Sequence, residues 1–178
     1  MGSRQVTLVI GGCRSGKSSF ALKAAEALNL PEHFFVATSI AEDDEMTDRV
    51  VKHRKERGPH WQTIEEPVHL GPVISRHSSD RAVLLVDCLT LWVSNLMFQL
   101  KDPDKIDACI VQLEAALASA SGPVLLVSNE VGCGIVPENR LARQFRDLAG
   151  GVNQRMAQVA DRVYTTIAGI DVQIKPKE

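Results

Sequence analysis

The apolar residues of this chain fall into two patterns that alternate along its length. Short apolar runs, often β-branched, end at glycine or at a polar residue, which is typical of strands buried on both faces of a parallel sheet. These runs predict core strands at Val6–Ile10, Phe34–Ala37, Val83–Val86 and Pro123–Val127. Segments rich in helix formers, or with apolar residues at helical spacing, predict helices at Ser18–Leu28, Glu42–Arg57, Leu89–Leu100, Ile106–Ala120 and Glu138–Val159.

Weaker signals complete the pattern. Trp61–Glu66 reads as a short extended piece, and 163–168 and 171–174, hinged at Gly169, read as a final pair of strands. Because strands alternate with helices, we expect one α/β domain over residues 1–178, with a mostly parallel central sheet flanked by helices. The Leu89–Leu100 helix is apolar almost all round, which predicts either a central position or a subunit contact.

Composition narrows the class of protein. The chain has 178 residues, 44% of them hydrophobic and 24% charged, with a formal net charge of −2. This composition excludes a disordered chain, and a charge so near zero disfavours nucleic acid as a partner. No apolar run reaches the roughly 18 residues of a membrane span, and no signal-peptide pattern is present, so we expect a cytoplasmic protein. The cysteines are far apart and form no zinc-binding pair, so we expect them to be reduced and buried: Cys13, Cys88, Cys109 and Cys133.

A glycine-rich motif lies between the first predicted strand and the first predicted helix. Residues 11–18 read Gly-Gly-Cys-Arg-Ser-Gly-Lys-Ser, which fits the phosphate-loop pattern G-x-x-x-x-G-K-[ST]. In such a loop the backbone N–H groups surround phosphate oxygens, the lysine reaches the β- and γ-phosphates, and the hydroxyl binds Mg²⁺. The motif therefore predicts a P-loop NTPase-like, three-layer fold that binds a nucleotide through Lys17 and Ser18.

Polar residues at the ends of the other core strands extend this site. Asp87 follows the strand at 83–86, where P-loop proteins place a carboxylate that holds Mg²⁺. Thr38 and Ser39 follow the second strand, and residues 128–130 (Ser-Asn-Glu) follow the fourth. Because parallel strands bring their carboxyl ends to one crevice, we expect these residues to lie beside the phosphate loop.

One histidine stands in unusual surroundings. Met46, Val50, His53 and Arg57 share one face of the predicted helix at 42–57, and further basic residues flank His53. A neutral imidazole can attack a phosphoryl group, with neighbouring cations offsetting the developing charge. Spacing alone leaves two readings open, a nucleophile or a partly buried structural histidine beside a solvated basic stretch.

These pieces together resemble the bifunctional adenosylcobinamide kinase / adenosylcobinamide-phosphate guanylyltransferase family of cobalamin synthesis. The likeness covers nearly the whole chain. Besides the phosphate loop, it is carried by the segments 37–39, 43–46, 61–63, 65–67, 87–90 and 128–137, and by Arg49, His53, Arg140, Arg143, residues 145–147, Asn153 and Gln154.

The resemblance implies two reactions. The aminopropanol hydroxyl of adenosylcobinamide is first phosphorylated with ATP or GTP. GMP then passes from GTP to adenosylcobinamide-phosphate through a GMP-histidine intermediate, giving adenosylcobinamide-GDP and pyrophosphate. By the motif the histidine is His53, and Lys17 is the second catalytic residue. The implied nucleotide contacts are Gly11, Gly12, Cys13, Arg14, Ser15, Gly16, Lys17, Ser18, Ala37, Thr38, Ser39, Arg54, Lys55, Glu56, Arg57, Glu65 and Asp87, with Ser18 and Asp87 as Mg²⁺ ligands.

Other expectations are looser. Topology suggests Glu130 as a base or metal-water ligand of the kinase step. The family resemblance implies a homotrimer. The apolar sequence of the helix at 89–100 makes this helix the expected contact between subunits. An alternative is a P-loop small-molecule kinase that lacks the guanylyltransferase step. A nucleotide-dependent switch is a further alternative, but the Asn-Lys-x-Asp motif that such proteins use to read guanine is absent.

Overall fold

The computed structural model describes residues 4–39 and 57–176. Strands and helices alternate through most of the chain, as the apolar pattern predicted. The strands are β1 (Val6–Gly11), β2 (Glu32–Ala37), β3 (Trp61–Glu65), β4 (Ala82–Asp87), β5 (Val124–Asn129), β6 (Arg162–Ile167) and β7 (Ile170–Lys175). The helices are α1 (Lys17–Glu26), α3 (Leu70–His77), α4 (Leu89–Gln99), α5 (Pro103–Ala118) and α6 (Arg140–Val159).

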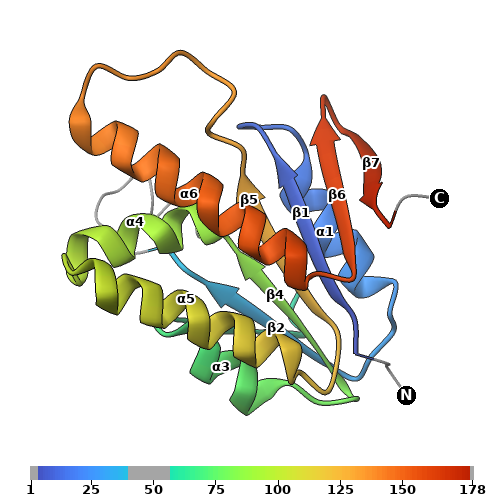
Figure 1. The fold of residues 1–178 in the computed structure, drawn as a ribbon. Coiled ribbons are helices and arrows are strands. Elements are labelled where there is room, and N and C mark those ends of the chain that lie inside the picture. The colour runs from blue at the N-terminus through green and yellow to red at the C-terminus, as the bar shows by residue number, and fades with distance from the viewer. Residues whose placement is uncertain (1–3, 40–56, 177–178) are drawn as a thin grey trace.

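All these strands join one sheet in the order β3-β2-β4-β5-β1-β6-β7. Each neighbouring pair from β3 to β6 is parallel, and only β7 among the described strands runs antiparallel to its neighbour, β6. Helices α3, α4, α5 and α6 cover one face of the sheet, while α1 lies on the other (Figure 1). The predicted mostly parallel α/β architecture in three layers is therefore confirmed.

The core consists of two apolar clusters, one on each face of the sheet. In β5, Val124 and Leu126 belong to the larger cluster with α3–α6, whereas Leu125 and Val127 belong to the cluster beneath α1. The other central strands alternate in the same way, because successive side chains of a strand point to opposite faces. This arrangement explains why the strand sequences are continuously apolar.

Some expectations need correction. The helix α3 was not predicted, because its apolar residues are few and its sequence contains Gly71 and Pro72. The piece at 61–66 is a full edge strand, β3, paired with β2. Of the cysteines, only Cys88 is buried, Cys109 is intermediate, and Cys13 and Cys133 are exposed. The predicted helix at 42–57 lies almost wholly outside the described residues.

Helix α4 is central, as one of its two predicted readings required. Trp92 and Leu96 are fully buried in the larger cluster, and the Trp92 indole N–H donates to the carbonyl oxygen of Val68 at 2.7 Å. Leu91 and Phe98 remain exposed on its outer side. Among the described residues no helix is long and apolar enough to cross a membrane.

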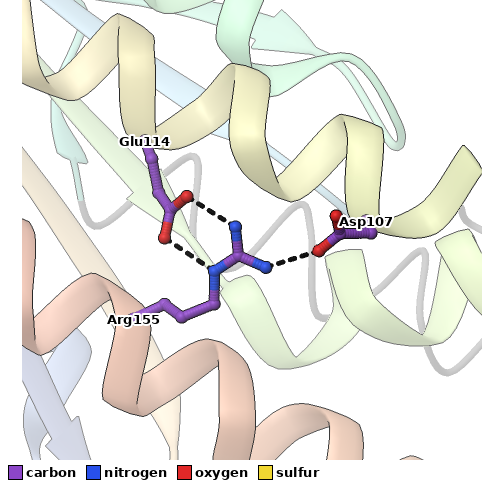
Figure 2. A network of polar contacts seen from close by, with 3 residues as sticks. All are labelled: Asp107, Glu114 and Arg155. Carbon is purple, nitrogen blue, oxygen red and sulfur yellow. Dashed lines mark hydrogen bonds and ion pairs between the residues drawn. The ribbon is translucent and has the colours of Figure 1, made fainter. Parts of the chain in front are cut away.

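The outer helices α5 and α6 are joined by one arginine (Figure 2). Arg155 of α6 donates from Nε and Nη2 to the two carboxylate oxygens of Glu114, at 2.6 and 2.5 Å, and from Nη1 to Asp107 at 2.6 Å. These hydrogen bonds raise the pKa of Arg155 above its usual range, so the guanidinium stays charged. A two-pronged pair of this kind fixes the relative position of the two helices.

Candidate active site

The phosphate-loop motif forms the connection it was expected to form, between β1 and α1. Gly16 caps α1 with φ of +98°, and a Cβ there would lie 3.2 Å from the Cα of Gly169, so this position requires glycine. No side chain of the described residues caps the first turn of α1, which leaves its backbone N–H groups available to an anion. Lys17 is buried, and its ammonium donates to the carbonyl oxygen of Gly12 at 3.1 Å.

The loop is braced by the hairpin at the far end of the chain. The hydroxyls of Ser15 and Thr166 lie 2.7 Å apart, and Gly169 N–H donates to the Ser15 carbonyl at 2.8 Å. A Cβ on Gly11 would lie 2.5 Å from Thr166 Oγ1 and 2.6 Å from Ser15 Oγ. Close packing therefore sets the shape of the loop, with β6 and β7 as its outer support.

The carboxyl ends of the parallel strands converge on the loop. Asp87 of β4 is in register with Ala37 of β2 and Val127 of β5, and Asn129 of β5 is in register with Gly11. Thr38 is fully buried: its hydroxyl donates to the carbonyl oxygen of Cys88 and accepts from the Cys88 N–H, both at 2.8 Å. The peptide bond between Asp87 and Cys88 is cis. The segments predicted to meet at this edge do so.

The pKa of Cys88 indicates that Lys17 lies near the end of β4. Burial raises the pKa of the Cys88 thiol to about 11, and the neighbouring Asp87 carboxylate contributes to this increase. Lys17 acts in the opposite direction on the same thiol, so its ammonium lies within electrostatic reach of the Asp87–Cys88 segment. Phosphates held by the loop would thus face one cation and one carboxylate.

A metal ion would have a limited set of protein ligands here. Within residues 4–39 and 57–176, no group of three or more His, Cys, Asp or Glu side chains could hold a metal by itself. Ser18 in the first turn of α1 and Asp87 at the end of β4 supply hard oxygen donors. Mg²⁺ is usually bound by one or two such groups together with phosphate oxygens and water, so this donor set fits Mg²⁺ in a nucleotide complex.

The other residues predicted to contact the nucleotide differ in exposure, and some of them lie outside the described residues. Arg57 is buried, with its guanidinium carbon 3.4 Å from the centre of the Phe35 ring, and Glu65 is exposed at the end of β3. Ser39 is half-buried after β2, and Gly12, Cys13 and Arg14 are exposed at the tip of the loop. His53, Arg54, Lys55 and Glu56 lie outside the described residues.

A polar network supports the end of β5. Ser128 Oγ donates to Asn153 Oδ1 at 2.6 Å, and Asn153 Nδ2 donates to the Asn129 carbonyl at 3.2 Å. Thr90 Oγ1 accepts from the Asn129 N–H at 2.7 Å. Glu130 N–H donates to the Gly11 carbonyl at 3.0 Å, and Glu130 Oε1 accepts from the Gly132 N–H at 2.6 Å. Helices α4 and α6 thereby hold this strand end against the phosphate loop.

Comparison with known proteins assigns this site to a family. The sequence model described as "Cobinamide kinase / cobinamide phosphate guanyltransferase" matches residues 7–174, which span the loop and every strand end of the site. The chain belongs to this family. Two relatives carry the name bifunctional adenosylcobalamin biosynthesis protein, CobU in Escherichia coli K12 and CobP in Pseudomonas aeruginosa PAO1. They are 44% and 40% identical to the chain, each over 94% of it, and the alignments cover 98% and 96% of the relatives.

Solved structures with low sequence identity to this chain share its fold. Flagellar accessory protein FlaH from Methanocaldococcus jannaschii superposes with a TM-score of 0.55 at 13% identity, over 98% of this chain and 80% of that one. An ATPase domain of known structure gives a TM-score of 0.53 at 13% identity, over 91% of this chain and 69% of that one. At such low identity only the fold is shared, and it is the predicted P-loop NTPase fold.

Several residues of this family member's site could not be predicted from the sequence. Thr166 and Gly169 brace the loop from the far end of the chain, since Ser15 and Thr166 are separated by 151 residues. Asn95 of α4 donates to the Thr38 carbonyl at 2.7 Å. These residues show no motif, because their role depends only on which elements lie side by side.

Proposed function

We propose that this chain performs both reactions for which its relatives are named, phosphorylation of cobinamide and guanylyl transfer to cobinamide phosphate. The supporting observation is the family match over residues 7–174 together with an intact phosphate loop at the strand ends. The substrates are ATP or GTP, adenosylcobinamide and adenosylcobinamide-phosphate. The family names both activities, so the second reaction does not rest on the loop alone.

Phosphate binding falls to the loop and its lysine. The N–H groups of 11–18 and the uncapped first turn of α1 bind phosphate oxygens, and Lys17 moves from the Gly12 carbonyl to the phosphates. Ser18 and Asp87 would hold Mg²⁺ together with the phosphates. The cation offsets phosphate charge when bound. Thr38, Ser39, Arg57 and Glu65 are our candidates for contacts to the rest of the nucleotide, on the strand ends beside the loop.

Guanylyl transfer uses His53 as the nucleophile. An imidazole nitrogen attacks the α-phosphorus of GTP, a P–N bond forms, and the bond to the bridging oxygen breaks with departure of pyrophosphate. A phosphate oxygen of adenosylcobinamide-phosphate then attacks the same phosphorus, and the P–N bond breaks to restore the histidine. Arg54, Lys55, Glu56 and Arg57, next to His53 in the sequence, are candidates for holding the nucleotide in this step.

Phosphorylation needs the other end of the nucleotide. The substrate hydroxyl attacks the γ-phosphorus, the bond to the β–γ bridging oxygen breaks, and the hydroxyl proton must leave. Glu130 is our candidate base, since its backbone N–H is bonded to Gly11 and its carboxylate, which accepts from Gly132 through Oε1, keeps a second oxygen that can take the proton. Because the two reactions occur at different phosphorus atoms, His53 serves only guanylyl transfer.

The remaining features of the proposal concern the whole chain. Residues 1–178 form one domain, and the enzyme works in the cytoplasm as a homotrimer. The exposed apolar residues Leu91 and Phe98 on α4 are our candidates for the contact between subunits. Light scattering coupled to gel filtration measures the oligomeric state directly.

Covalent labelling tests the proposed function. Pure enzyme is incubated with Mg²⁺ and GTP labelled at the α-phosphate, then denatured and washed with acid. We expect a label that is acid-labile, alkali-stable, absent in His53→Ala and retained in the control His69→Ala, whose histidine is exposed ahead of α3. No label in wild type, with cobinamide phosphorylation intact, would indicate a kinase without the transferase step. A label that survives in His53→Ala would assign the nucleophile to another residue.

A further inference from the structure

One buried polar side-chain atom of the described residues has no hydrogen-bond partner, and it lies beside the phosphate loop. This atom is Oδ1 of Asn129, the last residue of β5. Buried polar atoms are nearly always bonded, because an acceptor removed from water without a donor opposes folding. The exception at this position therefore requires an explanation.

The backbone around Asn129 is held firmly by hydrogen bonds, so a poorly packed strand end does not explain the unpaired oxygen. Its N–H donates to Thr90 Oγ1 at 2.7 Å, and its carbonyl accepts from Asn153 Nδ2 at 3.2 Å. Ser128, one residue earlier, is bonded to Asn153 and lies 3.3 Å from the Thr90 hydroxyl. Two helices hold the backbone here, and yet the side-chain oxygen has no partner among the described residues.

The pleat of the sheet places this side chain on the side of the phosphate loop. Ser128 points toward α4 and α6, so its neighbour Asn129 points to the opposite face, beneath α1. Asn129 is in register with Gly11, where an added Cβ would lie 2.5 Å from Thr166 Oγ1 of β6 and 2.6 Å from Ser15 Oγ of the loop. The unpaired oxygen thus belongs to the residue that lies beside the start of the loop, where β1 ends.

The missing partner must be a donor, and the lysine of the loop is engaged elsewhere. Lys17 donates to the Gly12 carbonyl. A nucleotide phosphate only accepts hydrogen bonds, but two kinds of O–H donor reach the phosphate end of the nucleotide: water carried by the nucleotide-bound cation, and the substrate hydroxyl that receives the phosphoryl group. Both can donate to an oxygen such as Asn129 Oδ1.

We infer that Asn129 contacts substrate in this enzyme, its Oδ1 accepting a hydrogen bond from an O–H group at the phosphate end of the bound nucleotide. This inference rests on the proposed function, since the substrates bring the donor. The oxygen then opposes folding when the site is empty and favours ligand binding when the site is filled.

Two substitutions separate this role from a structural one. Asn129→Leu replaces the amide by an apolar group of similar shape, and Asn129→Ala removes it without adding bulk. Asn153→Leu is the matched control, because both polar atoms of that buried amide are bonded. We expect the melting temperature without nucleotide to be unchanged or higher in Asn129→Leu and lower in Asn153→Leu.

Binding measurements then identify the donor. If cation-bound water is the donor, both Asn129 variants bind a non-hydrolysable ATP analogue with Mg²⁺ about tenfold more weakly than wild type does. When EDTA removes the cation, the variants and wild type bind the analogue with equal affinity. If the substrate hydroxyl is the donor, analogue binding is unchanged, and the affinity of the analogue-loaded enzyme for cobinamide, followed by corrin absorbance, falls by a similar factor.

The inference is overturned if both Asn129 variants bind analogue and cobinamide as wild type does. It is equally overturned if Asn129→Leu lowers the melting temperature as much as Asn153→Leu, because the amide would then be structural. Failure of the proposed function gives a different pattern: wild-type enzyme would bind the analogue, yet it would neither phosphorylate cobinamide nor form the histidine label.

Discussion

At the scale of single residues, the chemistry of this protein depends on which side chains water can reach. Cys13 lies exposed at the tip of the phosphate loop, whereas Cys88, under the same strand ends, is buried with its pKa raised to about 11. Two thiols at one site therefore differ in reactivity through burial, since the thiolate is the reactive form.

Alkylation should exploit this difference. We expect a maleimide to modify Cys13 and Cys133 and leave Cys88 intact, and to remove most nucleotide binding through Cys13, because an adduct there occupies the phosphate site. Bound nucleotide should protect Cys13 and not Cys133. Mass spectrometry of the modified protein, together with a nucleotide-binding assay, measures these effects. Inactivation that persists in Cys13→Ala and disappears in Cys133→Ala would contradict this assignment.

His33 on β2 should make stability depend on pH. Burial lowers the pKa of His33 below its ordinary 6.5, the nearby His60 lowers it further, and Glu26 opposes them. The neutral form is favoured in the folded protein, so its contribution to stability is complete above pH 6.5 and is lost as the pH falls toward the folded-state pKa. In urea titrations between about pH 7.5 and 5.5, His33→Phe should lose less stability than wild type. Equal losses would show that another group titrates.

At the scale of elements, helices hold the strand ends in place from behind. Thr90 of α4 and Asn153 of α6 bond the end of β5, and Asn95 of α4 bonds the residue after β2. Since α6 is itself tied to α5 by Arg155, the position of the β5 end depends on contacts well outside the site (Figure 2).

Breaking the α5–α6 connection tests its contribution to stability. Arg155→Met keeps the aliphatic stem and removes the hydrogen bonds to Glu114 and Asp107. These side chains are partly exposed, so solvent screening limits the expected loss to about 1–2 kcal/mol, or roughly 3–6 °C in melting temperature. The loss should shrink in about 1 M salt. A variant as stable as wild type at low salt would mean that the pairs contribute nothing.

At the scale of the whole molecule, the sheet has a core on each face, and each core contains a tryptophan. Trp92 is buried with α3–α6, while Trp61 lies in the cluster beneath α1. If residues 1–178 are one domain, both faces must unfold together, because the strands between them are shared.

Single-tryptophan variants provide the measurement. Fluorescence of Trp61→Phe reports on the larger cluster, and that of Trp92→Phe reports on the other. Within each variant, the denaturant midpoint by fluorescence should equal the midpoint by circular dichroism. A fluorescence transition that precedes the circular-dichroism transition in one variant would show that one layer unfolds separately.

Local sequence determined much of this protein. Residues 11–18 define the phosphate loop because a short backbone segment can bind phosphate with its own N–H groups, whatever lies around it. The continuous apolar runs at 83–86 and 123–127 identified buried parallel strands, and their last residues identified one edge of the sheet as the site. A repeating pattern within a few residues is sufficient for such inferences.

Only the tertiary structure decided which residues contact the phosphate loop and the end of β5 from other parts of the chain. Thr166 and Gly169 reach the loop through the sheet order, and Asn129 Oδ1 has no donor among the described residues because of how β5 lies between α4, α6 and the loop. The exposure of Cys13 and the existence of α3 also escaped the sequence. These properties depend on contacts between segments far apart in the chain. A local sequence pattern indicates which helix or strand a segment forms, but it does not indicate which other segments that helix or strand packs against.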